Sequence, residues 1–439
     1  MATLSADQIV ALSKRHTMFD WQAQSKVAPI PVERAEGIYF WDVDGKRYTD
    51  FNSQLWSVNA GHSDPRIVEA IAAQAGRLAF ISPFQTYEER ALLGQKLAEL
   101  LPGDIEKTFF TLGGAEANEN AMRIAKLYTG RQKILARYRS YHGSTYATMA
   151  LTGDPRRWPN EAPPMPGVVH VLDPYHGPGQ PWDDAERALA LLDETFQLEG
   201  PDTIAAFFLE TITGTNGVLI PPDGYLQGVR ELCDRYGILM MADEVMCGFG
   251  RTGEWFGVNH WDVVPDMLSM AKGLTSSYVP LGGLALRPHV AAHFDDQVFG
   301  AGLTYNSHPV GVAAALATIR VYEEDGLIEN SRKMGEVLAR HHQELKAKHP
   351  CVGDVRSIGL FGVIDLVKNA AGEPMSPYNV TNETMGKINR FLLDRGIYTM
   401  VRWWSVMTNP PLIIDEAQLA ETFAVIDEAL TIGDEAMED

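Results

Sequence analysis

The sequence predicts an α/β protein: a large domain with a mostly parallel sheet covered by helices, joined to a smaller α+β domain. Residues 203–209 (TIAAFFL) and 237–242 (GILMMA) are apolar on both faces, which is typical of parallel strands that are covered on both sides. Between them, residues 224–236 carry apolar side chains at helical spacing. These three segments form a strand–helix–strand unit.

Further short apolar runs extend this pattern along the middle of the chain. Residues 109–112, 133–136 and 267–270 each predict a strand, so the middle of the chain is expected to be doubly wound. In such sheets, ligands bind beyond the carboxyl ends of the strands. Polar side chains at those ends are therefore the first candidates for function.

The two ends of the chain differ from the middle. Residues 37–51 alternate aromatic and polar side chains around Asp44-Gly45 and predict a hairpin. From about residue 320 onward, amphipathic helices mix with short strands, and a closing helix is expected after an Asp415 cap. The predicted domains are residues 61–318 for the large domain and residues 1–60 with 319–439 for the small domain.

Residues 152–182 contain eight prolines, which indicates a long ordered loop or a lid.

Composition limits the partners of the 439-residue chain. Its formal net charge is -20 with the acids scattered, which argues against nucleic acid or an anionic membrane as a partner. The three cysteines are widely spaced and form no CxxC, so neither a disulfide framework nor a zinc site is expected. The first residues lack the apolar core of a signal peptide, and no run approaches a membrane span. These features predict a cytoplasmic protein.

Two glycine-containing stretches are candidates for ligand contact. In TLGGAEANENAMRIAKLY, Gly113-Gly114 joins a strand to a helix, either as a phosphate-binding N-terminus or as an ordinary tight turn. The stretch has no GK[ST] and no GxGxxG, so it is not a nucleotide motif. In RYRSYHGST, Tyr141 could lie on a planar ligand and Gly143 would allow close approach, although a surface aromatic beside a satisfied histidine is an equally good interpretation.

Three charged side chains follow apolar strands. Asp243 and Glu210 each close a strand and are candidates to bind a metal, to act as acid and base, or to pair with a buried cation. No histidine lies at metal-ligand spacing near either carboxylate, so no metal site is expected. Lys272, in LSMAKGLTSSYVPLGG, follows the strand at 267–270. Most lysines are solvated, but desolvation at the ligand end of a sheet would make this amine a Schiff-base nucleophile.

These four features fit one ligand. The helix N-terminus suits a phosphate, the aromatic a flat ring, the carboxylate a cationic ring nitrogen, and the lysine an aldehyde. Pyridoxal 5'-phosphate has all four groups.

Five motifs, in order, also resemble those of a known family. GGAEANE, YHGST, ADEVMCGFGRTG, MAKGL and GLTYNSHP are similar to the motif set of the class III aminotransferases, on the fold type I scaffold of pyridoxal-phosphate enzymes. The resemblance covers nearly the whole chain. It implies a homodimer or a dimer of dimers with shared active sites, and an amine donor with a 2-oxo acid acceptor as substrates.

The resemblance assigns roles to individual residues. Lys272 would hold the cofactor covalently and move the proton, and Asp243 would pair with the pyridine nitrogen. Val245 and Tyr141 would pack on the two faces of the ring. Glu210 would steady the site near the ring hydroxyl.

The same resemblance places the cofactor phosphate. Gly114 and Ala115 would donate backbone N–H groups, and Thr304 would reach the phosphate from the neighbouring subunit. His142 and Gly143 complete the expected cofactor contacts. Relatives often carry Ser or Thr where this chain has Ala115, so a hydroxyl contact is missing and weaker cofactor retention is expected.

The substrate pocket is predicted from looser similarity. Leu55 and Trp56 resemble the apolar pocket of ω-amino acid and amine–pyruvate aminotransferases, with Phe19, Trp21 and Phe84 as further wall residues. These residues favour a terminal-amine donor, such as β-alanine, taurine or an arylalkyl amine, with pyruvate or a related acceptor. An aminomutase of the same family and a catalytically silent ligand-binding relative are the alternatives.

Arg402, in RWWSVMTNPPL, lies near the position of the carboxylate-binding arginine of ω-aminotransferase relatives. It is a candidate anion partner on a mobile segment. Its alternative role is structural, stacked on Trp403 or Trp404.

Overall fold

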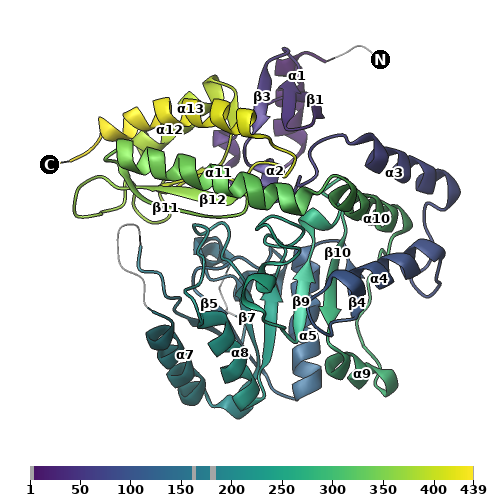
Figure 1. Ribbon diagram of the computed structural model, residues 1–439. Coiled ribbons are helices and arrows are strands. Elements are labelled where there is room, and N and C mark those ends of the chain that lie inside the picture. Colours follow the sequence, from purple (N-terminus) through teal and green to yellow (C-terminus); the bar gives the residue numbers. More distant parts are fainter. Residues whose placement is uncertain (1–3, 161–164, 178–183, 439) are drawn as a thin grey trace.

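A seven-stranded sheet forms the centre of the computed structural model, which describes residues 4–160, 165–177 and 184–438 (Figure 1). Six of the strands are parallel, and the inserted β10 runs antiparallel to both of its neighbours. The strands, in spatial order, are β4 (Lys107–Thr111), β10 (Gly282–Leu286), β9 (Met267–Met270), β8 (Leu239–Asp243), β7 (Ile204–Glu210), β5 (Lys133–Arg137) and β6 (Val168–Val171). The predicted, mostly parallel sheet is confirmed.

Helices cover the sheet on both faces. Side chains alternate across a strand, and Phe208 packs with α5 (Gly114–Thr129) while its neighbour Phe207 packs with α8 (Tyr225–Tyr236). Every residue of β7 and β8 is buried, which explains why their sequences are apolar throughout. The other helices that flank this part of the chain are α3 (Pro65–Arg77), α4 (Glu88–Leu100), α6 (Tyr146–Leu151), α7 (Ala185–Glu199), α9 (Pro288–Asp296) and α10 (Pro309–Glu324).

Two smaller sheets bring the ends of the chain together above the central sheet in Figure 1. The first contains β1 (Val32–Glu36), β2 (Tyr39–Asp42), β3 (Arg47–Asp50) and β13 (Ile397–Tyr398). Its β3 and β13 pair in parallel although they are far apart in sequence. The second contains β11 (Val352–Ile358), β12 (Phe361–Leu366), β15 (Ser405–Thr408) and β14 (Val401–Arg402). The helices of these parts are α1 (Ala6–His16), α2 (Ser53–Trp56), α11 (Leu327–Lys348), α12 (Glu383–Asp394) and α13 (Glu416–Asp434).

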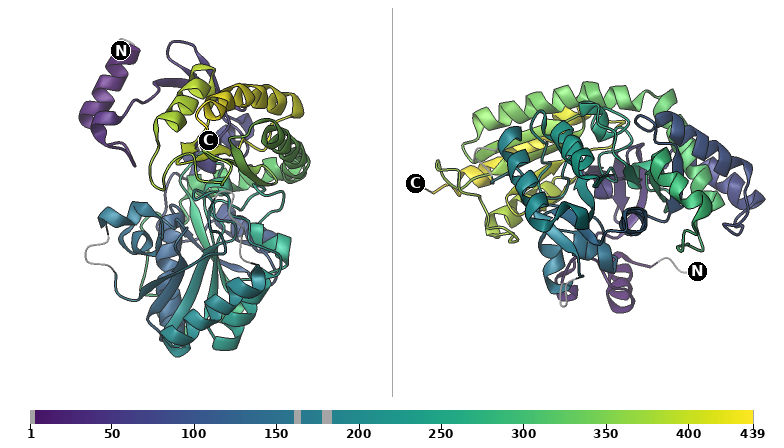
Figure 2. Two further views of the ribbon diagram at one scale, coloured as in Figure 1. Left: turned by 90° about the vertical axis from the view of Figure 1, so that its left-hand side faces the viewer. Right: turned by 90° about the horizontal axis from the view of Figure 1, so that it is seen from below.

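Several predicted elements of the two ends form as expected. The hairpin of β2 and β3 turns at Asp44-Gly45, and Gly45 has a φ of +85°, which favours glycine. Asp415 caps α13 by accepting the backbone N–H of Gln418 at 2.8 Å. In contrast, α1 buries none of its residues and projects from the body of the protein (Figure 2). The predicted domain boundary at residue 318 falls within α10, and the domain limits stay a prediction.

The proline-rich stretch differs from the expected loop. It contains β6, whose four residues pair in parallel with β5 and form an edge of the central sheet. The prediction of a long ordered loop or a lid was wrong for residues 168–171, because their sequence VVHV favours a strand although prolines surround it. Residues 161–164 and 178–183 of the stretch lie outside the described residues.

Candidate active site

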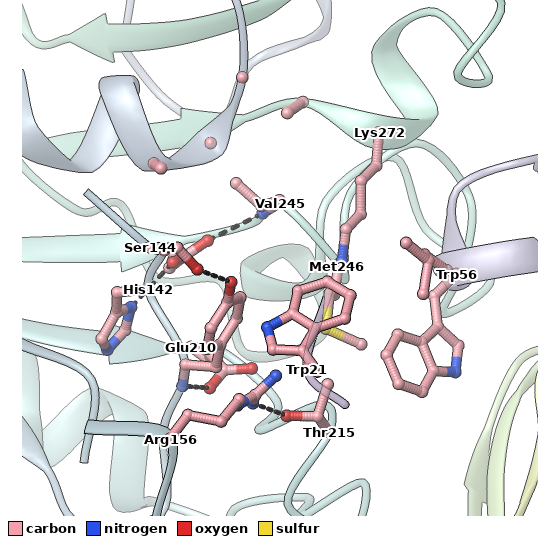
Figure 3. A pocket seen from close by; sticks show the side chains of 18 of the residues that line it. Trp21, Trp56, His142, Ser144, Arg156, Glu210, Thr215, Val245, Met246 and Lys272 are labelled. Carbon is pink, nitrogen blue, oxygen red and sulfur yellow. Dashed lines mark hydrogen bonds and ion pairs between the residues drawn. The ribbon is translucent and has the colours of Figure 1, made fainter. Parts of the chain in front are cut away.

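A cavity of about 720 Å³ lies at the carboxyl ends of β7, β8 and β9 (Figure 3). The start of α5 and the loop after β5 form one side. Trp21, Leu55 and Trp56 approach from the N-terminal part of the chain, and residues 400–403 approach from the C-terminal part. The cavity therefore lies where the central sheet meets both ends of the chain, which is the position expected for the ligand.

Asp243 and Glu210 occupy corresponding positions at the ends of neighbouring strands, because β7 pairs with β8 in a register that aligns the two residues. Both side chains line the cavity and both residues are buried. Oδ2 of Asp243 accepts hydrogen bonds from Nδ2 of Asn118 at 2.7 Å and lies 2.8 Å from Nδ1 of His142. Oδ1 accepts the backbone N–H of Val245 at 3.1 Å.

Glu210 is held by backbone groups. Its Oε1 accepts the N–H of Tyr141 at 2.9 Å, and its Oε2 accepts the N–H of Gly214 at 2.7 Å. Burial raises the pKa of Glu210, the nearby His142 lowers it, and the charge of Asp243 raises it further. The neighbouring carboxylate of Asp243 therefore disfavours the charged form of Glu210.

Lys272 follows β9 and extends its side chain into the cavity (Figure 3). Burial lowers the pKa of its amine to about 8, while the charges of Asp243 and Glu210 act in the opposite direction. Nζ lies 5.6 Å from the centroid of the Trp56 ring. The backbone φ of Lys272 is +45°, a left-handed conformation that is uncommon for a lysine and typical of functional positions.

The N-terminus of α5 borders the cavity, and the residues at this border are small. No side chain caps this helix, so the amide N–H groups of its first turn remain available to a ligand. A Cβ at Gly114 would lie 2.6 Å from Val245, and one at Gly143 would lie 2.5 Å from the Cβ of Ala115. Gly143 also has a φ of +137°, so both space and backbone require glycine there.

Pyridoxal 5'-phosphate fits these groups. The free N–H groups of α5 suit a phosphate, and the two glycines leave room that any Cβ would fill. Asp243 retains acceptor capacity on Oδ1, which suits a protonated ring nitrogen, and Lys272 offers an amine with a lowered pKa to an aldehyde. Within the described ranges, no group of three or more His, Cys, Asp or Glu side chains is placed to hold a metal ion.

The adjacent acid, Glu244, has a different environment from Asp243. It is fully buried, and it accepts the hydroxyl of Thr211 at 2.5 Å and the N–H groups of Gly257 and Val258 at 2.8 and 2.9 Å. Burial raises its pKa to about 7 despite these three donors. Glu244 is absent from the cavity lining and anchors the segment that follows β8.

Arg156 is a cavity residue that sequence reasoning missed. Its Cζ lies 3.7 Å from the centroid of the Tyr141 ring, and its Nη2 donates to Oγ1 of Thr215 at 2.7 Å (Figure 3). The same guanidinium forms an ion pair with Asp154. The signal in the sequence is an arginine pair directly after Gly153-Asp154-Pro155, within the proline-rich stretch that indicates a loop or a lid.

Arg402 also lines the cavity, and it packs on the ring of the neighbouring Trp403. Its Cζ lies 4.3 Å from the centroid of the Trp403 ring, and its Nη2 lies 3.3 Å from Oδ2 of Asp154. Burial and, to a smaller extent, the positive charge of Arg156 lower the pKa of Arg402 to about 10, while the charge of Asp154 acts in the opposite direction. The stacked contact and the access to the cavity therefore coexist.

Most predicted site residues lie at this one cavity: Trp21, Leu55, Trp56, Gly114, Ala115, Tyr141, His142, Gly143, Glu210, Asp243, Val245, Lys272 and Arg402. Three do not line it within a single chain. Phe84 is 95% exposed, Thr304 is exposed, and Phe19 is partly exposed. Their assignments stay predictions, and that of Thr304 depends on a second subunit.

The fold and the site together define a pyridoxal-phosphate-dependent transferase of fold type I. Residues 21–430 match the family model described as aminotransferase class III. The chain belongs to this family, its cofactor is pyridoxal 5'-phosphate, and it is an aminotransferase. No helix of the described chain is long and apolar enough to cross a membrane.

Named relatives support this membership over nearly full length. The chain is 34% identical to putrescine–pyruvate aminotransferase from Pseudomonas aeruginosa, over 94% of this chain and 93% of that protein. It is also 34% identical to taurine–pyruvate aminotransferase from Bilophila wadsworthia, over 98% of each chain. A solved structure of taurine:2-oxoglutarate aminotransferase from Bifidobacterium kashiwanohense, in complex with PLP and glutamate, is 41% identical, with a TM-score of 0.96 and 100% coverage of both chains.

Proposed function

We propose that the protein transfers the terminal amino group of a small donor, preferably one with an anionic far end such as β-alanine or taurine, to pyruvate or a related 2-oxo acid. The observation that carries this proposal is Arg156. Its guanidinium enters an otherwise largely apolar cavity directly over the ring of Tyr141. The positive charge of a guanidinium suits a carboxylate or a sulfonate, to which it donates charge-assisted hydrogen bonds.

The apolar walls agree with a donor that has a short carbon chain. Trp56 is buried at the cavity, and Trp21 and Leu55 lie on the same side. An arylalkyl amine would use these walls without using Arg156. The names of the similar proteins mention putrescine and taurine as substrates, which supports a terminal amine in general.

The residues of the site divide the chemical work. The bound cofactor supplies an aldehyde that accepts the amino group and a ring that withdraws electrons from the reacting carbon. Asp243 would keep the ring nitrogen protonated, and the amine of Lys272 would hold the cofactor and serve as the base and acid that moves the proton of the donor carbon. Val245 and Tyr141 hold the ring between them. Glu210 accepts the backbone N–H of Tyr141 and thereby fixes the loop that carries this residue.

Other predicted contacts complete this assignment. Gly114 and Ala115 donate N–H groups to the phosphate at the start of α5, and His142 acts through Asp243 while Gly143 makes room beside Ala115. Thr304 reaches the phosphate of a neighbouring subunit.

We infer that the active assembly is a homodimer or a dimer of dimers. Phe84 and Val298 are 95% and 91% exposed, which is unusual for large apolar side chains and suits a surface covered by a second copy. A cytoplasmic location stays a prediction, supported by three cysteines that are buried and free.

The test is a half-reaction screen with the purified holoenzyme. Taurine, β-alanine, putrescine and an arylalkyl amine are added singly, and the visible absorbance of the bound cofactor is followed. We expect bleaching by anionic donors at the lowest concentrations, and recovery when pyruvate or 2-oxoglutarate is added.

Each alternative has its own outcome in the same screen. An aminomutase would convert its substrate to an isomer without any added 2-oxo acid. A silent binder would show no spectral change with any donor. Equal use of charged and uncharged donors would contradict the role proposed for Arg156.

A further inference from the structure

Asp154 is a buried carboxylate shared by the two arginines of the cavity. The side chain is fully buried, and it forms ion pairs with both Arg156 and Arg402. These arginines are separated by 246 positions in sequence and approach the cavity from different parts of the fold. Nδ2 of Asn216, at 3.4 Å from Oδ2, completes the surroundings of the carboxylate.

The two arginines are held unequally. The backbone N–H of Arg156 donates to Oδ1 of Asp154 at 3.0 Å, and its Nε lies 3.1 and 2.9 Å from the two carboxylate oxygens. The hydroxyl of Thr215 and the ring of Tyr141 restrain the same guanidinium. Arg402 makes a single contact with Asp154 at 3.3 Å, and its buried Nε has no hydrogen-bond partner among the described residues. Arg156 is therefore held firmly in place, whereas Arg402 is held to Asp154 by one contact and keeps N–H donors available for a substrate.

The charges explain why both arginines can be present. Two guanidinium groups beside one carboxylate leave one net positive charge at this end of the cavity. Like charges in a desolvated site repel strongly, and Asp154 compensates for that repulsion. A substrate with one distal anion matches the remaining charge. A second carboxylate on the substrate would need a further cation, and Arg402 is the cation with the weaker hold on Asp154.

We propose that Asp154 is a positioning residue that sets substrate preference: it fixes Arg156 for the single anion of donors and restrains Arg402, which a dicarboxylate acceptor must draw away. This proposal deepens the proposed function and rests on it. Asp154 would thereby distinguish two classes of acceptor. Pyruvate has one carboxylate and needs one cation, whereas 2-oxoglutarate has two carboxylates and uses both arginines.

The test is Asp154→Asn in the holoenzyme. Asparagine keeps one oxygen as an acceptor but loses the charge, so Arg156 is held less firmly and Arg402 is released. We expect the KM for taurine and β-alanine to rise at least about tenfold, as loss of a charged hydrogen bond predicts. The KM for an arylalkyl amine should change less than about threefold. The ratio of kcat/KM for 2-oxoglutarate to that for pyruvate should rise.

A matched control is Asp173→Asn. Asp173 is also buried and forms an ion pair with an arginine, Arg139, but neither residue lines the cavity. We expect it to lower the melting temperature without changing the acceptor ratio. A parallel fall for all substrates in Asp154→Asn, with an unchanged acceptor ratio, would overturn the proposal.

Two further variants keep the test decisive if Asp154→Asn does not fold. Arg402→Met should lower the 2-oxoglutarate to pyruvate ratio and leave the KM for taurine nearly unchanged. Thr215→Val removes a hydroxyl that is hydrogen-bonded to Arg156 and not to Arg402. This variant should raise the KM for taurine and leave the acceptor ratio unchanged. The opposite pattern in either variant contradicts the division of roles. A wild-type enzyme that accepts no anionic donor would instead refute the proposed function itself.

Discussion

Nδ1 of His142 lies 2.8 Å from Oδ2 of Asp243, and it shares that oxygen with the amide of Asn118. Both side-chain donors therefore occupy Oδ2, whereas among the described residues Oδ1 accepts only the N–H of Val245. Nε2 of His142 is buried and has no hydrogen-bond partner within the described chain. This arrangement orients Asp243 and leaves Oδ1 able to accept one more hydrogen bond, from the ring nitrogen of the cofactor.

Replacing Asp243 by asparagine tests this orientation. Asparagine keeps the shape but removes the charge that keeps the ring nitrogen protonated. We expect the single-turnover rate to fall about a hundredfold or more, which corresponds to at least about 3 kcal/mol in the barrier. Glu244→Gln is the control, because it alters the neighbouring buried carboxylate outside the cavity. An Asp243→Asn enzyme with near-normal turnover would mean that the carboxylate serves another purpose.

Lys272→Ala should abolish both turnover and the covalent link to the cofactor, since no other amine is expected to replace this one at the site. Borohydride reduction followed by mass spectrometry of peptides measures the link directly. The wild type should carry the reduced cofactor on Lys272, and the variant should carry none there. Transamination by the variant at the parent rate would refute the assignment.

The pKa of Lys272 predicts a pH dependence for cofactor capture by the apoenzyme. Only the neutral amine attacks an aldehyde, and burial lowers the pKa of this amine to about 8. The capture rate should therefore rise with pH through about 8 and then level off, as followed by stopped-flow absorbance. A rate that still climbs steeply near the ordinary lysine pKa, about 10.4, would show that the amine is not desolvated.

Glu244 should make part of the stability dependent on pH. Its pKa is raised from 4.5 to about 7 in the folded protein, so between these values the folded state binds more protons than the unfolded state. The favourable contribution is fully present below pH 4.5 and is lost as the pH rises through about 7. Thermal unfolding from pH 5 to 8 should show a smaller decline in Glu244→Gln than in the wild type. Parallel curves would contradict the raised pKa.

Arg156→Met should separate charged from uncharged donors. Methionine keeps much of the length and apolar contact but cannot bind an anion. We expect the KM for taurine and β-alanine to rise about tenfold or more, with a much smaller change for an arylalkyl amine. Steady-state kinetics with both donor types measures the split, and the melting temperature checks the fold. Equal losses on both types would assign Arg156 a structural role.

The sequence by itself determined five of the seven strands of the central sheet, namely β4, β5, β7, β8 and β9, and three chemical groups at its edge. The apolar strands β7 and β8 end in Glu210 and Asp243, and Lys272 follows β9 closely; parallel strands bring their carboxyl ends to one edge. Local periodicity and the strand direction are sufficient for that inference. The hairpin at Asp44-Gly45 and the cap at Asp415 were equally local, and both were predicted.

Only the tertiary structure decided which polar groups meet around those three. Asn118 and His142 reach the same oxygen of Asp243 from different segments, and Asp154 contacts both its near neighbour Arg156 and Arg402, which lies 248 positions further along the sequence. The pairing of β6 with β5 at an edge of the sheet is likewise visible only in the folded chain. Such contacts depend on long-range pairing and on the burial that it creates. The local sequence pattern contains no signal for these long-range contacts. They can therefore be identified only in the folded structure.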